Sequence, residues 1–371
     1  MFNIEVILSF LVVIGILAGL IDFVYVGDLY LFILIASGLV LLIYYLIIKF
    51  NKYIFVLIGS MLLLFIFLLK FLFYQSTGDI TFYLLLNAQI GIGMHFIESK
   101  NSYRIFVAIY LTLVAITLAY FLGGVAPGDI SQRSSENIVN YVVLAFSVML
   151  IALHYKKYNN IIFSPAIFST LVSFWTLGRS GMLVSLFLLI GMYIVKYYER
   201  ISKLTLSISL IILTLFGYTI YNFTIEIITK VIYRFGERTT FIEDSPRLKI
   251  INDYLNKLNF KTFFLGFDFS ENYFYGYTNL HNSFLNLQSK FGIGGIILII
   301  LLIGILLYFL INKQFLYFVL MLSLLVRGAT DIVMLVGRYD FVLMYLILIF
   351  MESRRLQMAG KSTNHYNKNL T

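Results

Sequence analysis

Residues 29–48 read LYLFILIASGLVLLIYYLII, an uncharged run bounded by Asp28 and Lys49. A helix needs roughly 20 predominantly apolar residues to cross the hydrocarbon core of a bilayer. The composition of the whole chain is also strongly apolar. Of its 371 residues, 61% are hydrophobic and only 12% are charged, whereas soluble domains are nearer ~25% charged. The sequence therefore predicts an all-α polytopic membrane protein, and it lacks the short alternating segments of a β-barrel.

Apolar segments of this kind recur and predict about 12 transmembrane helices. The first follows no basic region and precedes no small-residue cleavage site, so we interpret it as a membrane helix and not as a signal peptide. We expect helices one to nine within 1–222, a loop over 223–283, helices ten to twelve within 284–351 and a tail over 352–371. In chain order the segments are 4–21, 29–48, 53–74, 80–97, 105–122, 138–153, 161–177, 181–195, 204–222, 284–310, 315–330 and 335–351.

The distribution of Lys and Arg orients these helices. Short connections after even-numbered helices are basic, as at Lys49 and Lys52, whereas the opposite connections carry acidic residues such as Asp22 and Asp79. Because cytoplasmic loops are enriched in Lys and Arg, we expect both termini in the cytoplasm. The same loops carry most of the formal net charge of +9, which therefore does not indicate a nucleic-acid partner.

The chain has no cysteine, which excludes disulfides, iron–sulfur clusters and thiolate metal sites. We expect the loop 223–283 to lie outside the cytoplasm. Loops of this length are usually either functional or disordered, and the helix signals within this loop predict that it is ordered. Ser245-Pro246 is typical of a helix start. Leu248, Ile251, Leu255 and Leu258 recur at helical spacing and predict an amphipathic helix over about 246–258.

Three polar motifs on this predicted outer side could bind phosphate. Arg179 lies in the turn TLGRSG (176–181), where its planar fork and the N-terminus of a helix both suit an anion. Arg247 stands just inside the start of the amphipathic helix. His281 and Asn282 directly precede the tenth helix, where a histidine can act as a general base or bond a phosphate.

Each motif also has an ordinary interpretation. Arg179 could be a snorkelling arginine in a turn, and His281 could be an interfacial histidine. Arg247 could be a surface residue paired with Glu243 or Asp244. Arg234 and Arg238, four residues apart in the loop, could extend a positive patch or simply solvate a helix face.

Other polar residues are expected to be structural. Asn87 and Gln89 should bond between helices. His95 lies at the cytoplasmic end of the fourth predicted helix, away from the three outer motifs, and is expected to be structural. Four charges near the last outer turn are expected to form ion pairs, with a lesser alternative in which one of the arginines lines a cavity. These four are Arg327, Asp331, Arg338 and Asp340.

Three segments together resemble the O-antigen polymerase and O-antigen ligase superfamily, bacterial membrane glycosyltransferases related to the GT-C class. They are GRSG at 178–181, SPRLKIINDYL at 245–255 followed by FFLGFDF at 263–269, and LHNSFLNLQSKFGIGG at 280–295. The chain departs from the family pattern at one point. The family often has two glycines in the loop turn, whereas here a single Gly266 is followed by Phe267 and Asp268.

The resemblance implies transfer of a glycan from undecaprenyl pyrophosphate to a hydroxyl of an acceptor glycan on the outer face of the cytoplasmic (inner) membrane. It implies neither a metal nor another cofactor. Arg179 and Arg247 would clamp the pyrophosphate. His281 would complete that clamp or orient the acceptor hydroxyl, with Asn282 or Glu243 assisting, and Arg234 and Arg238 would contact substrate.

Three functions remain open at this point. We favour a polymerase that joins lipid-linked repeat units, with or without a chain-length regulator. A ligase that transfers the glycan to lipid A–core shares the same motifs. The alternative from another class is a flippase for the same lipid-linked glycan, but charges inside the predicted spans are few, Lys70 being the clearest.

Overall fold

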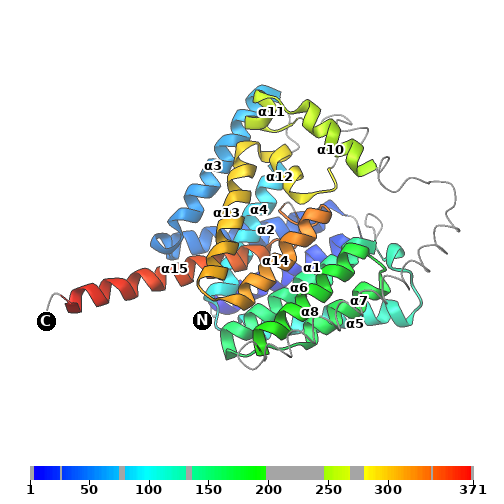
Figure 1. Ribbon diagram of the computed structural model, residues 1–371, viewed down its shortest axis with the longest axis horizontal. Coiled ribbons are helices and arrows are strands. Elements are labelled where there is room, and N and C mark those ends of the chain that lie inside the picture. The colour runs from blue at the N-terminus through cyan, green and yellow to red at the C-terminus, as the bar shows by residue number, and fades with distance from the viewer. Residues whose placement is uncertain are drawn as a thin grey trace, which may run out of the picture.

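The computed structural model describes residues 4–25, 27–74, 80–130, 136–197, 246–267, 280–335 and 337–368. Within these residues it does not describe the side chains of Tyr74, Glu136, 246–248 and 358–368. Every regular element in this part of the chain is helical (Figure 1). Eight of the helices are long and apolar enough to cross a membrane, as expected for a polytopic helical membrane protein. They are α1 Ile4–Val24, α2 Asp28–Ile48, α3 Phe50–Tyr74, α4 Ile80–Glu98, α5 Ser102–Leu122, α6 Glu136–Tyr158, α8 Arg179–Tyr197 and α13 Ile293–Ile311.

The remaining helices are shorter or extend beyond the apolar region. They are the 3₁₀ turn η1 Pro127–Asp129 and the helices α7 Ser164–Trp175, α10 Pro246–Lys257, α11 Phe260–Leu265, α12 Ser283–Phe291, α14 Phe315–Thr330 and α15 Phe341–Lys368. The predicted ninth span, 204–222, lies outside the described residues, so the total of 12 spans stays a prediction.

Glycines allow close helix packing in the centre of the bundle. A Cβ atom on Gly91 of α4 would lie 2.0 Å from the carbonyl oxygen of Gly38 on α2. A Cβ atom on Gly38 would in turn lie 2.4 Å from the carbonyl oxygen of Ala88. Small residues at such crossings let two backbones touch, which supplies packing where the surrounding lipid is as apolar as the side chains. The α2–α4 crossing therefore requires glycine at both positions.

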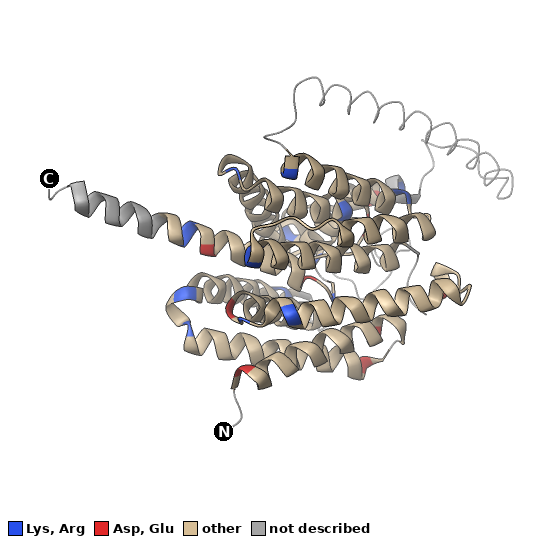
Figure 2. Cartoon of the chain, turned by 90° about the horizontal axis from the view of Figure 1, so that it is seen from below, with Lys and Arg blue, Asp and Glu red and all other residues tan. Residues whose placement is uncertain are grey.

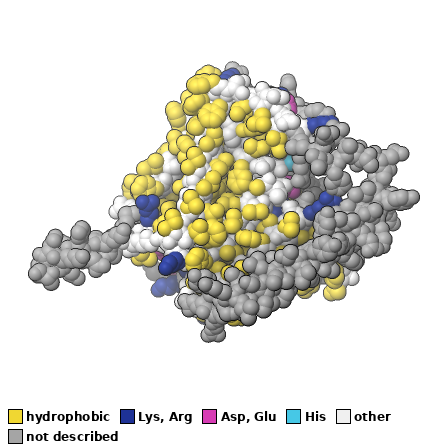
Figure 3. Space-filling model, viewed as in Figure 1, with side chains coloured by type: hydrophobic (Ala, Val, Ile, Leu, Met, Phe, Trp, Pro, Cys, Tyr) yellow, Lys and Arg dark blue, Asp and Glu magenta, His cyan; other side chains and the backbone are white. Residues whose placement is uncertain are grey.

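The outer surface is apolar over a broad area. Figure 3 shows a band of hydrophobic side chains across one face, with Lys and Arg near its margins. In Figure 2 the charged residues lie mainly near the ends of the helices. Exposed side chains of α3 and α13 include Phe55 and Ile300, which are 74% and 63% accessible. This pattern suits lipid around the middle of the helices and water at their ends.

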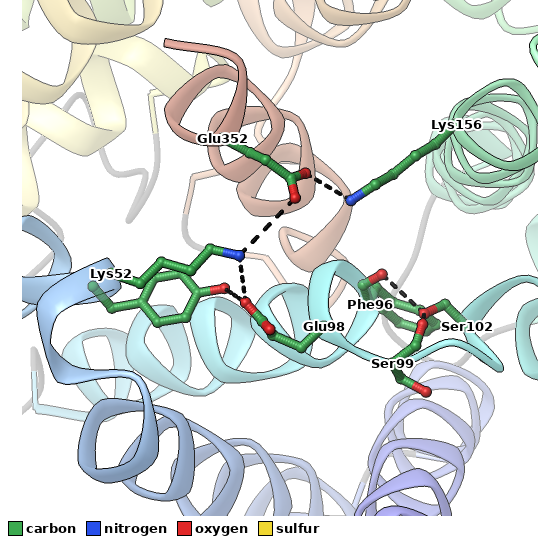
Figure 4. A network of polar contacts seen from close by, with 8 residues as sticks. Lys52, Phe96, Glu98, Ser99, Ser102, Lys156 and Glu352 are labelled. Carbon is green, nitrogen blue, oxygen red and sulfur yellow. Dashed lines mark hydrogen bonds and ion pairs between the residues drawn. The ribbon is translucent and has the colours of Figure 1, made fainter. Parts of the chain in front are cut away.

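Charged residues at one end of the bundle form a connected network. Lys52 Nζ lies 2.5 Å from Glu98 Oε1, and the Tyr53 hydroxyl donates to the same oxygen at 2.5 Å (Figure 4). Lys156 Nζ lies 2.7 Å from Glu352 Oε2. The network joins α3, α4, α6 and α15, and we call this the Lys52 end. The opposite end carries the start of α8 and is called the Arg179 end.

The predicted helix 284–310 is wrong as a single element, because the chain breaks at Gly292. Gly292 has φ +54°, and a Cβ atom there would lie 2.1 Å from the carbonyl oxygen of Phe264. The end of α11 and the adjoining Gly266 therefore lie directly over this glycine. The short α12 and the spanning α13 meet at the crossing with a change of direction that an uninterrupted helix could not make.

Two other predicted spans also differ. The segment 161–177 forms only the 12-residue α7, which at 1.5 Å per residue is about 18 Å long and shorter than a bilayer core of about 30 Å. The last helix begins at Phe341 instead of 335, because the Asp340 carboxylate accepts from the backbone N–H groups of Leu335 and Gly337 and holds a turn there. It then continues to Lys368, through most of the expected tail 352–371.

Candidate functional site

The turn that carries Arg179 packs against the start of α6. Arg179 is the first residue of α8, and its side chain is exposed. A Cβ atom on Gly178 would lie 2.7 Å from Asn137 Oδ1, and one on Gly181 would lie 2.4 Å from Asn140 Oδ1. The two glycines therefore admit two asparagines of α6, one turn apart, against the first turn of α8. The first N–H groups of a helix lack intrahelical acceptors and favour anions.

Asn140 is wholly buried beneath this turn. Among the described residues, neither its Nδ2 nor its Oδ1 atom has a hydrogen-bond partner. A buried polar group without a partner costs about 1–3 kcal/mol. Native structures contain few such groups, so each needs an explanation.

Arg327 connects α14 to the same region of α6. Its side chain is 0% exposed, and Nη2 donates to the carbonyl oxygen of Asn137 at 2.9 Å. The predicted ion pair with Asp331 is present at 3.7 Å. Arg338 also forms an ion pair, but its partner is Asp22 of α1. The prediction is wrong for Asp340, whose carboxylate accepts from the N–H groups of Leu335 and Gly337 and has no cation partner among the described residues. Asp340 is occupied by backbone donors, so its carboxylate no longer needs a cation.

The His281 motif begins α12 and contacts the end of α14. Asn282 Oδ1 accepts from the N–H groups of Phe284 and Leu285, and its Nδ2 donates to the carbonyl oxygen of Ala329 at 2.9 Å. Asn282 is thus an N-cap with both amide atoms engaged, and its role toward substrate stays a prediction. His281 is half-buried with φ +48°, a left-handed conformation that is uncommon outside glycine.

A continuous series of contacts leads from the His281 motif to the Arg179 turn. Asn282 bonds to Ala329, beside the end of α14. Arg327 of α14 bonds to Asn137, and the Asn137 side chain packs against Gly178. Two of the three predicted phosphate-binding motifs therefore share one end of the bundle, and Arg327 and the α6 asparagines lie between them.

The loop helix α10 is fixed to α12 through Gln288. The Tyr254 hydroxyl donates to Gln288 Oε1 at 2.6 Å, and burial raises the pKa of Tyr254 to about 12, which keeps it a donor. Gln288 Nε2 donates to the carbonyl oxygens of Thr262 and Phe263. The predicted loop helix is present over Pro246–Lys257. Its apolar contact face differs from the predicted one, because Ile250 and Tyr254 are buried and Leu255 is 55% exposed.

Several predicted site residues fall outside the described part of the chain. Arg234, Arg238 and Glu243 lie there, as does the side chain of Arg247, although its backbone belongs to α10. The proposed convergence of Arg179 and Arg247 therefore stays a prediction. Within the described residues, no group of three His, Cys, Asp or Glu side chains could hold a metal ion.

The residues predicted to be structural are bonded between helices. Ser60 donates to Asn87 Oδ1 at 2.6 Å, and the N–H of Phe341 donates to Gln89 Oε1 at 3.0 Å. His95 is buried beside the Tyr45 hydroxyl at 3.0 Å. Sequence reasoning missed Asn140 and Gln288. An amide side chain inside an apolar segment is itself a sign of a possible binding site. Many such amides only form hydrogen bonds between helices, however, so the sign does not identify a site.

No protein-family model matches the chain, and no curated protein is significantly similar to it in sequence. The resemblance to the polymerase and ligase superfamily therefore rests on the three motifs alone.

Proposed function

We propose that the protein is a membrane glycosyltransferase that joins undecaprenyl-pyrophosphate-linked repeat units into O-antigen, capsule or exopolysaccharide. The observation that supports this most is the meeting of two motifs at one end of a helical membrane bundle. Arg179 begins α8 and His281 precedes α12, and contacts through Arg327 connect the two. A lipid-linked phosphate presents its head group at this depth, where the apolar spans end.

The reaction needs charge stabilisation more than proton transfer. A hydroxyl oxygen of the acceptor forms a new bond to the anomeric carbon of the donor, and the bond from that carbon to the phosphate oxygen breaks. The electron pair leaves with polyprenyl pyrophosphate, and the hydroxyl proton passes to a base or to solvent. The guanidinium of Arg179 and the N–H groups at the α8 N-terminus suit the charge that grows on the leaving group.

The loop arginine fits the same scheme. Arg247 lies in the first turn of α10, and the Gln288 bonds hold that helix against α12. A second guanidinium carried by a fixed helix could grip the other phosphate of the leaving group. Two guanidinium groups bound to one pyrophosphate would supply the positive charge that a divalent metal ion supplies in other enzymes.

His281 has two candidate roles. As a general base it would accept the proton of the acceptor hydroxyl. As a ligand it would donate a hydrogen bond to a phosphoryl oxygen. We favour the ligand role, because a hydroxyl that attacks carbon bearing a good leaving group needs little help from a base.

The direct test uses the purified protein in lipid nanodiscs with its native lipid-linked repeat unit. We expect a ladder of products on a gel, and Arg179→Ala should abolish it. A single addition to lipid A–core would instead identify the ligase. Movement of the lipid across a vesicle membrane without a new glycosidic bond would identify the flippase and refute the proposal.

The proposed active site is extracytoplasmic, and this can be tested separately. The chain has no native cysteine, so Lys257→Cys in α10 gives a unique thiol. An impermeant thiol reagent should label it on intact spheroplasts. Labelling only after permeabilisation would invert the proposed topology.

A further inference from the structure

We infer that Asn140 recognises a sugar hydroxyl or acetamido group next to the phosphate, so that the site has separate anionic and glycan subsites. This inference rests on the proposed function for the identity of the ligand. Its structural basis is a buried amide aimed at the first turn of α8, directly behind the exposed Arg179.

The amide of Asn140 differs from the other buried amides of the described residues. Gln89 and Gln314 each leave one amide atom without a partner but use the other, since Gln89 accepts from Phe341 and Gln314 donates to Ser353. Asn87 uses both of its amide atoms. At Asn140 both the donor and the acceptor are left without a partner in the described part of the chain. The local packing there therefore provides nothing that satisfies this side chain.

The chemistry of the unsatisfied pair limits the ligand. A phosphoryl oxygen could accept a hydrogen bond from Nδ2. It has no hydrogen to donate, so it would leave the acceptor Oδ1 without a partner. A hydroxyl or an acetamido group both donates and accepts, so it can satisfy both atoms at once. Arg179 and the helix N-terminus supply only donors, which suits phosphate. A glycosyl phosphate carries both kinds of group within one or two bonds.

The first turn of α8 covers Asn140. Gly178 and Gly181 carry no side chains between this turn and the two asparagines. Since Asn140 is fully covered, a sugar reaches it only when the first turn of α8 shifts. The sugar then replaces the contact of Asn140 with Gly181.

The test compares binding of two probes in nanodiscs, undecaprenyl pyrophosphate without sugar and the native lipid-linked repeat unit extracted from cells. Asn140→Leu should weaken binding of the repeat unit about 10-fold or more, because a site built to bond a hydroxyl loses that contact. Binding of undecaprenyl pyrophosphate should be unchanged. The melting temperature should be unchanged or higher, because an unsatisfied amide is removed.

Asn87→Leu is the matched control, since it removes a buried membrane amide that already has partners. It should lower the melting temperature and leave the ratio of the two affinities unchanged. Equal changes of both affinities in Asn140→Leu, no change in either, or a lower melting temperature would each overturn the inference. Asn140→Ser, which keeps a hydroxyl, should retain part of the discrimination, and complete loss there would also count against it.

Failure here is distinguishable from failure of the proposed function. A wild-type protein that prefers the repeat unit, loses the preference in Asn140→Leu and yet forms no glycosidic bond would refute the polymerase and leave the glycan subsite standing. If instead the wild-type protein makes the product ladder and Asn140→Leu changes neither affinity, the glycan subsite is refuted and the polymerase proposal stands.

Discussion

The two ends of the bundle use polar residues in different ways. At the Lys52 end, Lys52 and Lys156 are each paired with a carboxylate at 2.7 Å or less, and the Glu98 carboxylate accepts from a tyrosine as well. At the Arg179 end, Arg179 is exposed and Asn140 is buried without a partner among the described residues. A satisfied network needs no ligand to explain it, whereas a buried amide without a partner does.

Backbone conformation adds a smaller difference between the two ends. Asn159 and Lys313 at the Lys52 end and Leu177 at the Arg179 end have positive φ just after a helix, where a left-handed residue is a common way to end it. His281 also has positive φ, and it lies in a predicted site motif directly before α12. The conformation of His281 therefore suggests a functional role, whereas helix termination accounts for the other three.

The largest expected effect is at Arg179. Arg179→Lys keeps the charge but loses the planar fork, so polymerisation should fall about 10²-fold or more, the usual cost of removing one transition-state donor. Lys156→Ala at the opposite end is the control and should leave activity unchanged, because exposed ion pairs contribute about 0–1 kcal/mol. Rates of product-ladder formation measure both. A wild-type rate in Arg179→Lys would contradict the proposal that the Arg179 end, and not the Lys52 end, acts on the substrate.

The next effect separates the roles of His281. As a phosphate ligand it can be replaced in part by another donor, so His281→Gln should keep substantial activity and His281→Ala should lose about 10-fold. A general base cannot be replaced by an amide, and a loss of about 10² or more in His281→Gln would favour that role. Single-turnover rates distinguish them. Wild-type rates from both variants would remove His281 from the site.

A smaller effect is expected at Gln288, which touches the loop and no proposed substrate group. Gln288→Leu removes bonds to Tyr254 and Thr262, each with a net worth of about 1 kcal/mol. We expect faster hydrogen exchange in α10 and a several-fold loss of activity, mostly as a higher KM for donor. Tyr254→Phe removes one of these bonds and should show a milder form. Unchanged exchange in α10 would mean that Gln288 does not hold the loop helix.

The smallest effect on activity is expected at Glu98. Glu98→Gln leaves Tyr53 without its carboxylate and leaves Lys52 with only the longer contact to Glu352 at 4.0 Å. It should therefore lower the melting temperature by a few degrees, because a close, partly buried ion pair is lost. Activity of the remaining folded protein should be unchanged. A large loss of activity without loss of stability would show that the Lys52 end also acts on substrate.

The sequence alone determined the properties that depend on runs of neighbouring residues. Uncharged segments such as 29–48 must leave water as helices, because only intrahelical bonds satisfy the backbone in lipid. The loop helix over about 246–258 is equally local, because Ser245-Pro246 and the apolar periodicity that follows lie within one short segment.

Only the tertiary structure decided which distant residues meet. The break at Gly292 arises because Phe264 crosses it, and Arg338 pairs with Asp22 because α1 ends beside the last turn. Asn140 lies in an apolar segment that predicts a helix and nothing more. Its place beneath Gly181 is set by the packing of α6 against α8. Such contacts join residues tens to hundreds of positions apart, and local periodicity carries no information about them.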